Sequence, residues 1–154
     1  DEAVVSLKHI FDDYMLSSGG DASRAIATIL SPCIRAGGFL PRANFPMHLI
    51  EGDDSQAGKG YLLKIIGGIY HETPALVTKQ VGGVGSLDES FASAMAKGHP
   101  ILQLDNIRGR LDSALIEMVL TSNELVQVRI PHTGNIELDP SHITVITTSN
   151  GLTL

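Results

Sequence analysis

Apolar and polar positions repeat along this chain with two periods, one typical of helices and one typical of strands. Residues 2–16 carry an apolar side chain every three or four positions, which predicts an amphipathic helix. A second helical period follows Asp21, a residue that caps helices well, and stops at Gly37-Gly38. Pro32 lies inside this period and is expected to kink or restart the helix. The N-terminal quarter of the chain is therefore predicted to be helical.

Beyond residue 44, short apolar runs alternate with helical periods. Four runs predict buried strands, at residues 47–51, 74–78, 100–104 and 143–148. Helical periods follow the first three of these runs. Strands that are apolar throughout and alternate with helices indicate a parallel sheet covered on both faces. We therefore expect an α/β fold, a three-layer αβα sandwich with a mostly parallel sheet.

Two helix starts and one hairpin refine this outline. Ser86 with Glu89 has the spacing of a capping box, and Asp112 is expected to cap the helix after the third strand. Residues 126–130 and 136–139 alternate around a turn-forming stretch, which predicts a β-hairpin inserted before the last strand. The chain then divides into an N-terminal helical segment, residues 1–44, that packs on a core, residues 45–154.

Composition limits the class of protein. The chain has 154 residues, 43% of them hydrophobic and 18% charged, which is a globular composition of one-domain size. A net charge of −6 argues against an overall basic surface for nucleic acid, and no apolar run is long enough to span a bilayer. The single cysteine, Cys33, suits a reducing compartment, so a cytoplasmic location is expected. The first residue is Asp rather than Met, so we expect a piece of a longer protein.

The strongest chemical signal is the stretch DDSQAGKG at residues 53–60, between the first strand and a helical period. A glycine-bearing loop before a helix directs backbone N–H groups and the positive end of the helix dipole at a phosphate. Gly58 and Lys59 match the GxxxxGK[ST] pattern of a Walker A loop, while Asp53 and Gly60 depart from it, and Gly60 lacks the hydroxyl that ligates Mg²⁺. An ordinary surface turn is the alternative. The residues expected to bind nucleotide are Asp54, Ser55, Gln56, Ala57, Gly58, Lys59, Gly60 and Tyr61.

Two later strands end in polar residues. Asp105 ends the apolar run 100–104, which resembles a Walker B strand, and is expected to hold Mg²⁺ directly or through water. Asn106 stands where a glutamate is usual, and its amide can orient a water but cannot take a proton. Asn150 follows the run 143–148 and resembles a sensor 1 residue that contacts the γ-phosphate or the attacking water. The alternatives are a turn residue for Asn106 and an Asn-Gly turn for Asn150.

These three motifs, in this order over residues 45–151, resemble the core of AAA+ P-loop ATPases. Residues 82–113 look similar to ATPases of phage and mobile-element replication modules, which are often associated with a primase or helicase. The resemblance implies ATP and Mg²⁺ as cofactors, a homo-oligomeric ring and action on DNA. It also implies a C-terminal lid, expected to lie outside this sequence, and a fifth strand, expected to be absent or only begun here. The hairpin looks like a pre-sensor insertion, whose Arg129 and His132 could contact nucleic acid, although a plain surface hairpin is the alternative. Arg108 and Arg110 could face a neighbouring subunit or simply pair with Asp112.

Four functions stay open on the sequence alone. The favoured hypothesis is an ATP-hydrolysing motor core that acts in DNA replication of a mobile element. The second is an assembly module that binds ATP without hydrolysing it, as Gly60 and Asn106 suggest. The third is a small-molecule kinase on a P-loop fold, and the fourth is a vestigial loop that binds no nucleotide.

Overall fold

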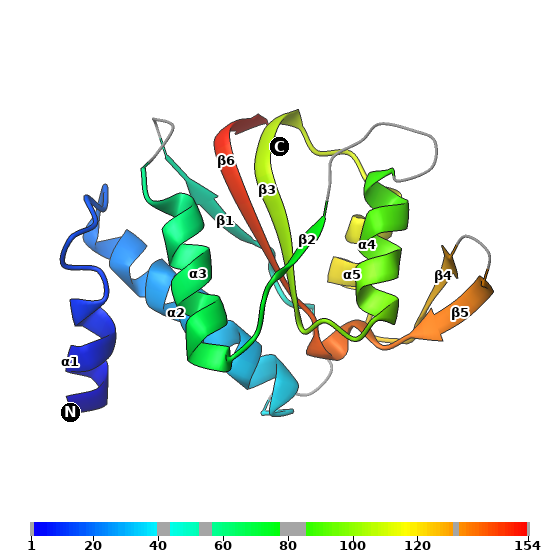
Figure 1. Cartoon of the computed structure of the whole chain (residues 1–154), viewed down its shortest axis with the longest axis horizontal. Coiled ribbons are helices and arrows are strands. Elements are labelled where there is room, and N and C mark those ends of the chain that lie inside the picture. The colour runs from blue at the N-terminus through cyan, green and yellow to red at the C-terminus, as the bar shows by residue number, and fades with distance from the viewer. Residues whose placement is uncertain (1, 40–43, 53–56, 78–85, 131–132, 154) are drawn as a thin grey trace.

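A four-stranded parallel sheet forms the centre of the molecule (Figure 1). The computed structural model describes residues 2–39, 44–52, 57–77, 86–130 and 133–153. The strands lie in the order β1-β6-β3-β2, with β1 at His48–Glu51, β6 at Thr144–Thr153, β3 at Ile101–Arg110 and β2 at Ala75–Val77. Because every neighbouring pair is parallel, the carboxyl ends of all four strands point to the same edge.

Helices cover both faces of this sheet (Figure 1). One face carries α1 (Glu2–His9), α2 (Gly19–Ala36) and α3 (Lys59–Tyr70), and the other carries α4 (Leu87–Ala96) and α5 (Ala114–Thr121). The alternation of side chains along β3 supplies both cores. Ile101 packs with the first group of helices, while Leu102 and Leu104 pack with the second. The predicted α/β fold, with a parallel sheet between helices, is confirmed.

The predicted hairpin is also present, before the last strand of the sheet. Its strands are β4 (Val126–Ile130) and β5 (Gly134–Leu138), which pair antiparallel and form a separate sheet. Val126 and Val128 are buried in the same core as α4 and α5, so the base of the hairpin is packed against the domain. A single 3-10 turn, η1 (Pro140–His142), leads from the hairpin into β6.

The first helix is shorter than predicted. α1 ends at His9, and the chain then makes tight turns in which the Phe11 N–H donates to the Lys8 carbonyl at 3.0 Å. Phe11 is buried and meets the ring of Tyr14 edge-on at 5.9 Å between centroids. Phe11 and Tyr14 continue the apolar spacing of the helix, but they lie in turns and pack on the core from there.

One of the three predicted helix caps is confirmed. Ser86 accepts the Glu89 N–H at 3.3 Å, as expected of a capping box. Ser113, not Asp112, caps α5 by accepting the Ile116 N–H at 3.1 Å. Ser18, not Asp21, is the N-cap position of α2, and α2 continues without a break through Pro32.

Both long strands run past their predicted ends. β3 continues to Arg110 and β6 continues to Thr153, and the two stay paired after irregularities between Leu104 and Ile107 and between Ile107 and Gly109. The predicted ends were wrong because glycines and polar residues do not end a strand while its backbone hydrogen bonds are still made by a paired strand, as they are between β3 and β6.

Candidate active site

The start of α3 supplies the first group of side chains in the site. β1 ends at Glu51, and α3 begins at Lys59 with Gly58 as its N-cap residue. Gly58 has φ +78°, a conformation that favours glycine, and a Cβ there would lie 3.2 Å from the Tyr14 ring, which would have to shift slightly. The predicted order of strand, glycine and helix is therefore present. Asp54, Ser55 and Gln56 lie outside the described residues.

The carboxyl ends of β3 and β6 supply the second group. β6 lies between β1 and β3, and its Asn150 contacts both Lys59 of α3 and Asn106 of β3. Asp105 and Asn106 fall within the first pairing irregularity of β3, where a strand can redirect a side chain. Asn106 adopts φ +52°, a conformation that non-glycine residues rarely take and that concentrates at functional sites.

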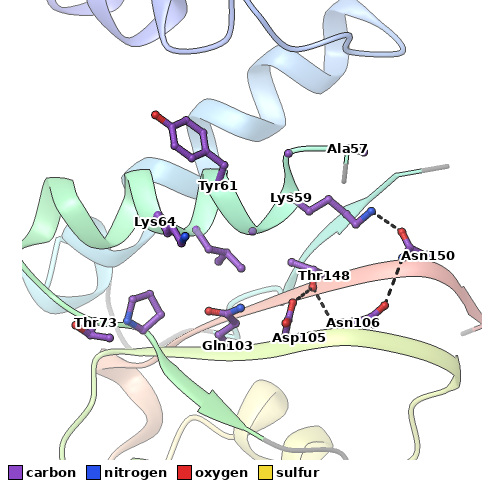
Figure 2. A pocket seen from close by; sticks show the side chains of 14 residues that line it. Ala57, Lys59, Tyr61, Lys64, Thr73, Gln103, Asp105, Asn106, Thr148 and Asn150 are labelled. Atoms are coloured by element: carbon purple, nitrogen blue, oxygen red, sulfur yellow. Dashed lines mark hydrogen bonds between the residues drawn. The ribbon is translucent and has the colours of Figure 1, made fainter. Parts of the chain in front are cut away.

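Hydrogen bonds join these groups into one chain of contacts (Figure 2). The Lys59 ammonium donates to the Asn150 side-chain oxygen, and the Asn150 amide donates to the Asn106 side-chain oxygen at 3.4 Å. Thr148 donates to an Asp105 carboxylate oxygen at 2.6 Å and accepts the Asn106 backbone N–H at 2.8 Å. The structure thus brings together Lys59, Asp105, Asn106 and Asn150, which the sequence singled out from three separate segments.

A pocket of about 660 Å³ opens over this network, which is within the usual range for small-molecule sites. It is lined by residues of α3 and the loops around it, by β3 and by β6: Ala57, Gly58, Lys59, Gly60, Tyr61, Leu63, Lys64, Thr73, Pro74, Gln103, Asp105, Asn106, Thr148 and Asn150. Tyr61 lines the rim only, because its ring is 64% exposed and points away from the network (Figure 2).

Several lining residues were not found from the sequence. The sequence indicates Thr148 only as part of a strand. Because it lies two residues before Asn150, it shares a face with Asn150 and reaches the same site. Gln103 carried a usable signal, as a polar residue inside the apolar run 100–104. Lys64 and Thr73 carried none, because only the packing of α3 and the turn after it brings them to the pocket.

The described pocket residues that could ligate a metal ion fit Mg²⁺. Among the described residues that line the pocket, Asp105 is the only carboxylate, and no cluster of three His, Cys, Asp or Glu side chains occurs in the part of the chain described. Gly60 brings no hydroxyl, and a Cβ there would meet nothing within 4 Å. Mg²⁺ is commonly held by one or two carboxylates, substrate phosphates and water, so these residues fit Mg²⁺ bound together with a phosphate ligand.

The remaining candidates lie apart from the pocket. Arg129 is exposed on β4 and lines a second cavity of about 650 Å³ beside α4 and α5. His132 lies outside the described residues. Arg110 lies 3.8 Å from the Asp112 carboxylate, so the predicted pairing with Asp112 is present, and Arg108 is exposed on the same extension of β3.

Comparison with known proteins finds no match at three levels. No family model, no curated protein and no solved structure matches the chain. Among the helices described, none has both the length and the apolar character needed to cross a membrane. The function must therefore be argued from the site itself.

Proposed function

We propose that this protein binds ATP with Mg²⁺ and is the core of an ATP-driven motor of the AAA+ type. One observation carries the proposal. A lysine that opens a helix after a strand and a glycine faces an acid and two amides from neighbouring parallel strands, across a single pocket. Ligands of parallel α/β sheets bind at this edge, outside the carboxyl ends of the strands.

The phosphates are proposed to bind at the start of α3. Backbone N–H groups in the first turn of a helix point out of its end and favour an anion there. Lys59 would exchange its bond with Asn150 for the β- and γ-phosphates, where its charge is better compensated. Asp105 would hold Mg²⁺ with the oxygen that Thr148 leaves available.

The amide pair Asn106 and Asn150 is proposed to orient the attacking water. Their side chains already contact each other at 3.4 Å, beside the carboxylate of Asp105. Hydrolysis of this kind depends mostly on positioning and on neutralising charge, so an amide can serve in place of a glutamate.

The wider biological setting belongs to the same proposal. A homo-oligomeric ring, a cytoplasmic location and action on DNA in replication of a mobile element follow from the resemblance of the three motifs. Of the two hairpin candidates, Arg129 is the one that the structure describes, and its exposed side chain could contact nucleic acid phosphates. Glu137 on the paired strand β5 is acidic and reduces the positive charge of the hairpin.

A second function is favoured by the lining of the pocket. Among the described residues that line it, Asp105 is the sole carboxylate, and Gly60 supplies no hydroxyl for Mg²⁺. A protein that binds ATP to organise an assembly, with negligible turnover, would need neither a general base nor this hydroxyl. Turnover by the full-length protein that is lost in Lys59→Ala would eliminate this second function.

The test of nucleotide binding is isothermal calorimetry with ATP and Mg²⁺ on wild-type protein and on Lys59→Ala. Loss of a charge-assisted bond to phosphate should weaken binding by roughly tenfold or more. The matched control is Lys97→Ala, which removes an exposed lysine at the end of α4. Equal binding by Lys59→Ala and wild type, or no binding by either, would overturn the proposal.

A further inference from the structure

One end of the pocket lies away from the bond between Lys59 and Asn150, and the proposed nucleotide contacts do not use it. We call it the inner end. This inner end is lined by Leu63, Lys64, Thr73, Pro74 and Gln103. In Figure 2, Lys64, Thr73 and Gln103 lie on the opposite side of the pocket from the bond between Lys59 and Asn150. A triphosphate held by Lys59 and Asp105 leaves these three polar side chains for another group.

A close approach of the backbone builds the wall of the inner end. Gly67 lies one turn after Lys64 on α3, and a Cβ there would lie 2.6 Å from the Glu72 carbonyl oxygen and 3.0 Å from the Pro74 ring. The Glu72 N–H also donates to the Gly67 carbonyl at 2.9 Å. The chain therefore turns back directly beneath α3, and this turn holds Thr73 and Pro74 against the pocket.

The three polar side chains of the inner end offer donors of different chemistry. Lys64 offers a cation, Thr73 a hydroxyl and Gln103 an amide, and no side-chain hydrogen bond or ion pair joins them to other residues across the described ranges. Gln103 is half-buried on a strand whose neighbouring Leu102 and Leu104 are fully buried. Lys64 and Thr73 are exposed, so all three polar side chains can reach a ligand from the open side of the pocket.

We propose that the inner end binds a second oxyanion, a phosphate or a carboxylate, while the nucleotide occupies the outer end. Lys64 supplies the charge that an oxyanion needs, and Gln103 and Thr73 donate hydrogen bonds to its oxygens. The oxyanion is either the phosphate cut from the nucleotide or a group on a separate small molecule. The proposal rests on the proposed function only for the identity of the outer ligand.

Inorganic phosphate is the probe for this site. Phosphate is titrated by calorimetry into protein saturated with ADP and Mg²⁺, for wild type, Lys64→Met and Lys97→Met. We expect phosphate to bind wild type and Lys97→Met alike, and to bind Lys64→Met about tenfold more weakly. ADP should bind all three proteins with nearly equal affinity, which also shows that Lys64→Met is folded.

Three results would overturn the second site. They are no phosphate binding beside ADP, displacement of phosphate by ADP, or equal losses in Lys64→Met and Lys97→Met. Failure of the nucleotide proposal is distinguishable, because phosphate would then still respond to Lys64→Met while ADP showed no binding.

Single-turnover release of phosphate separates the two sources of the oxyanion. Water attack on the terminal phosphorus breaks its bond to the bridging oxygen and yields ADP and inorganic phosphate. Faster release of that phosphate from Lys64→Met than from wild type assigns the inner end to the cleaved phosphate. Equal release rates, together with the Lys64 dependence of phosphate binding, assign it to an oxyanion on a separate ligand.

Discussion

Asn106 combines an unusual backbone conformation with a place in the site. Its φ of +52° costs a residue with a Cβ more than it costs glycine, and asparagine tolerates it better than most residues do. The side chain is exposed and makes a long contact, at 3.4 Å, with the Asn150 amide. The backbone conformation and the proposed positioning of water therefore make separate demands on this residue.

Substitution at Asn106 separates these two demands. Asn106→Gly should be more stable than Asn106→Ala by about 1 kcal/mol, because only glycine adopts this conformation without strain. The free energy of unfolding from urea titration measures the difference. If ATP is hydrolysed, both variants should lose turnover alike, since both lack the amide. An alanine variant as stable as the glycine variant would show that the conformation costs nothing.

At the scale of elements, α3 is the helix on which the site depends. Its first residue is Lys59, its exposed Lys64 lines the pocket, and its Gly67 allows the returning chain to pack closely. The helical period and the glycine before it could be predicted from the sequence. The role of Gly67 could not, because a glycine inside a helical period gives no sign of which backbone approaches it.

Two adjacent glycines of α3 allow a matched test of this packing. Gly67→Ala should destabilise the protein by about 1–3 kcal/mol, because its methyl group would overlap the Glu72 carbonyl. Gly68→Ala should instead stabilise by about 0.5–1 kcal/mol, since a Cβ there meets nothing within 4 Å and alanine favours a helix. Thermal or urea unfolding of the pair gives the answer. Equal effects of the two substitutions would contradict the close approach.

At the scale of the whole molecule, a partly buried polar contact joins the N-terminal helix α2 to the sheet. His48 on β1 contacts Thr28 at 3.2 Å and Ser31 at 2.7 Å, both on α2. Burial lowers the pKa of His48, and the nearby Arg35 lowers it further. The folded protein therefore holds this imidazole neutral at pH values where the unfolded chain, with a pKa near 6.5, begins to take up a proton.

The sign of the pH effect follows from that difference. Protonation of His48 does not change stability well above the unfolded-state pKa, and it lowers the free energy of unfolding as pH falls through about 6.5 toward the lowered folded-state pKa. Urea unfolding at about pH 7.5 and about pH 5.5 should show a smaller loss in His48→Gln than in wild type. The control His142→Gln removes an exposed histidine on η1 and should behave as wild type does. Identical losses in His48→Gln and wild type would refute this role.

The sequence by itself determined the secondary structure of the core and most of the polar ends of its strands. Hydrophobic period fixes which segments are helices or strands, because each must bury one face. It also marked Asp105, Asn106 and Asn150, as polar residues at the ends of apolar strands, and Lys59, which follows a glycine before a helical period.

Only the tertiary structure decided which of these ends meet. The order β1-β6-β3-β2 places the last strand between the first and third, and local period carries no information about strand neighbours. The same packing brought Thr148, Lys64 and Thr73 to the pocket. Contacts between residues far apart in the chain depend on how layers of structure pack, and a single sequence records that packing only indirectly.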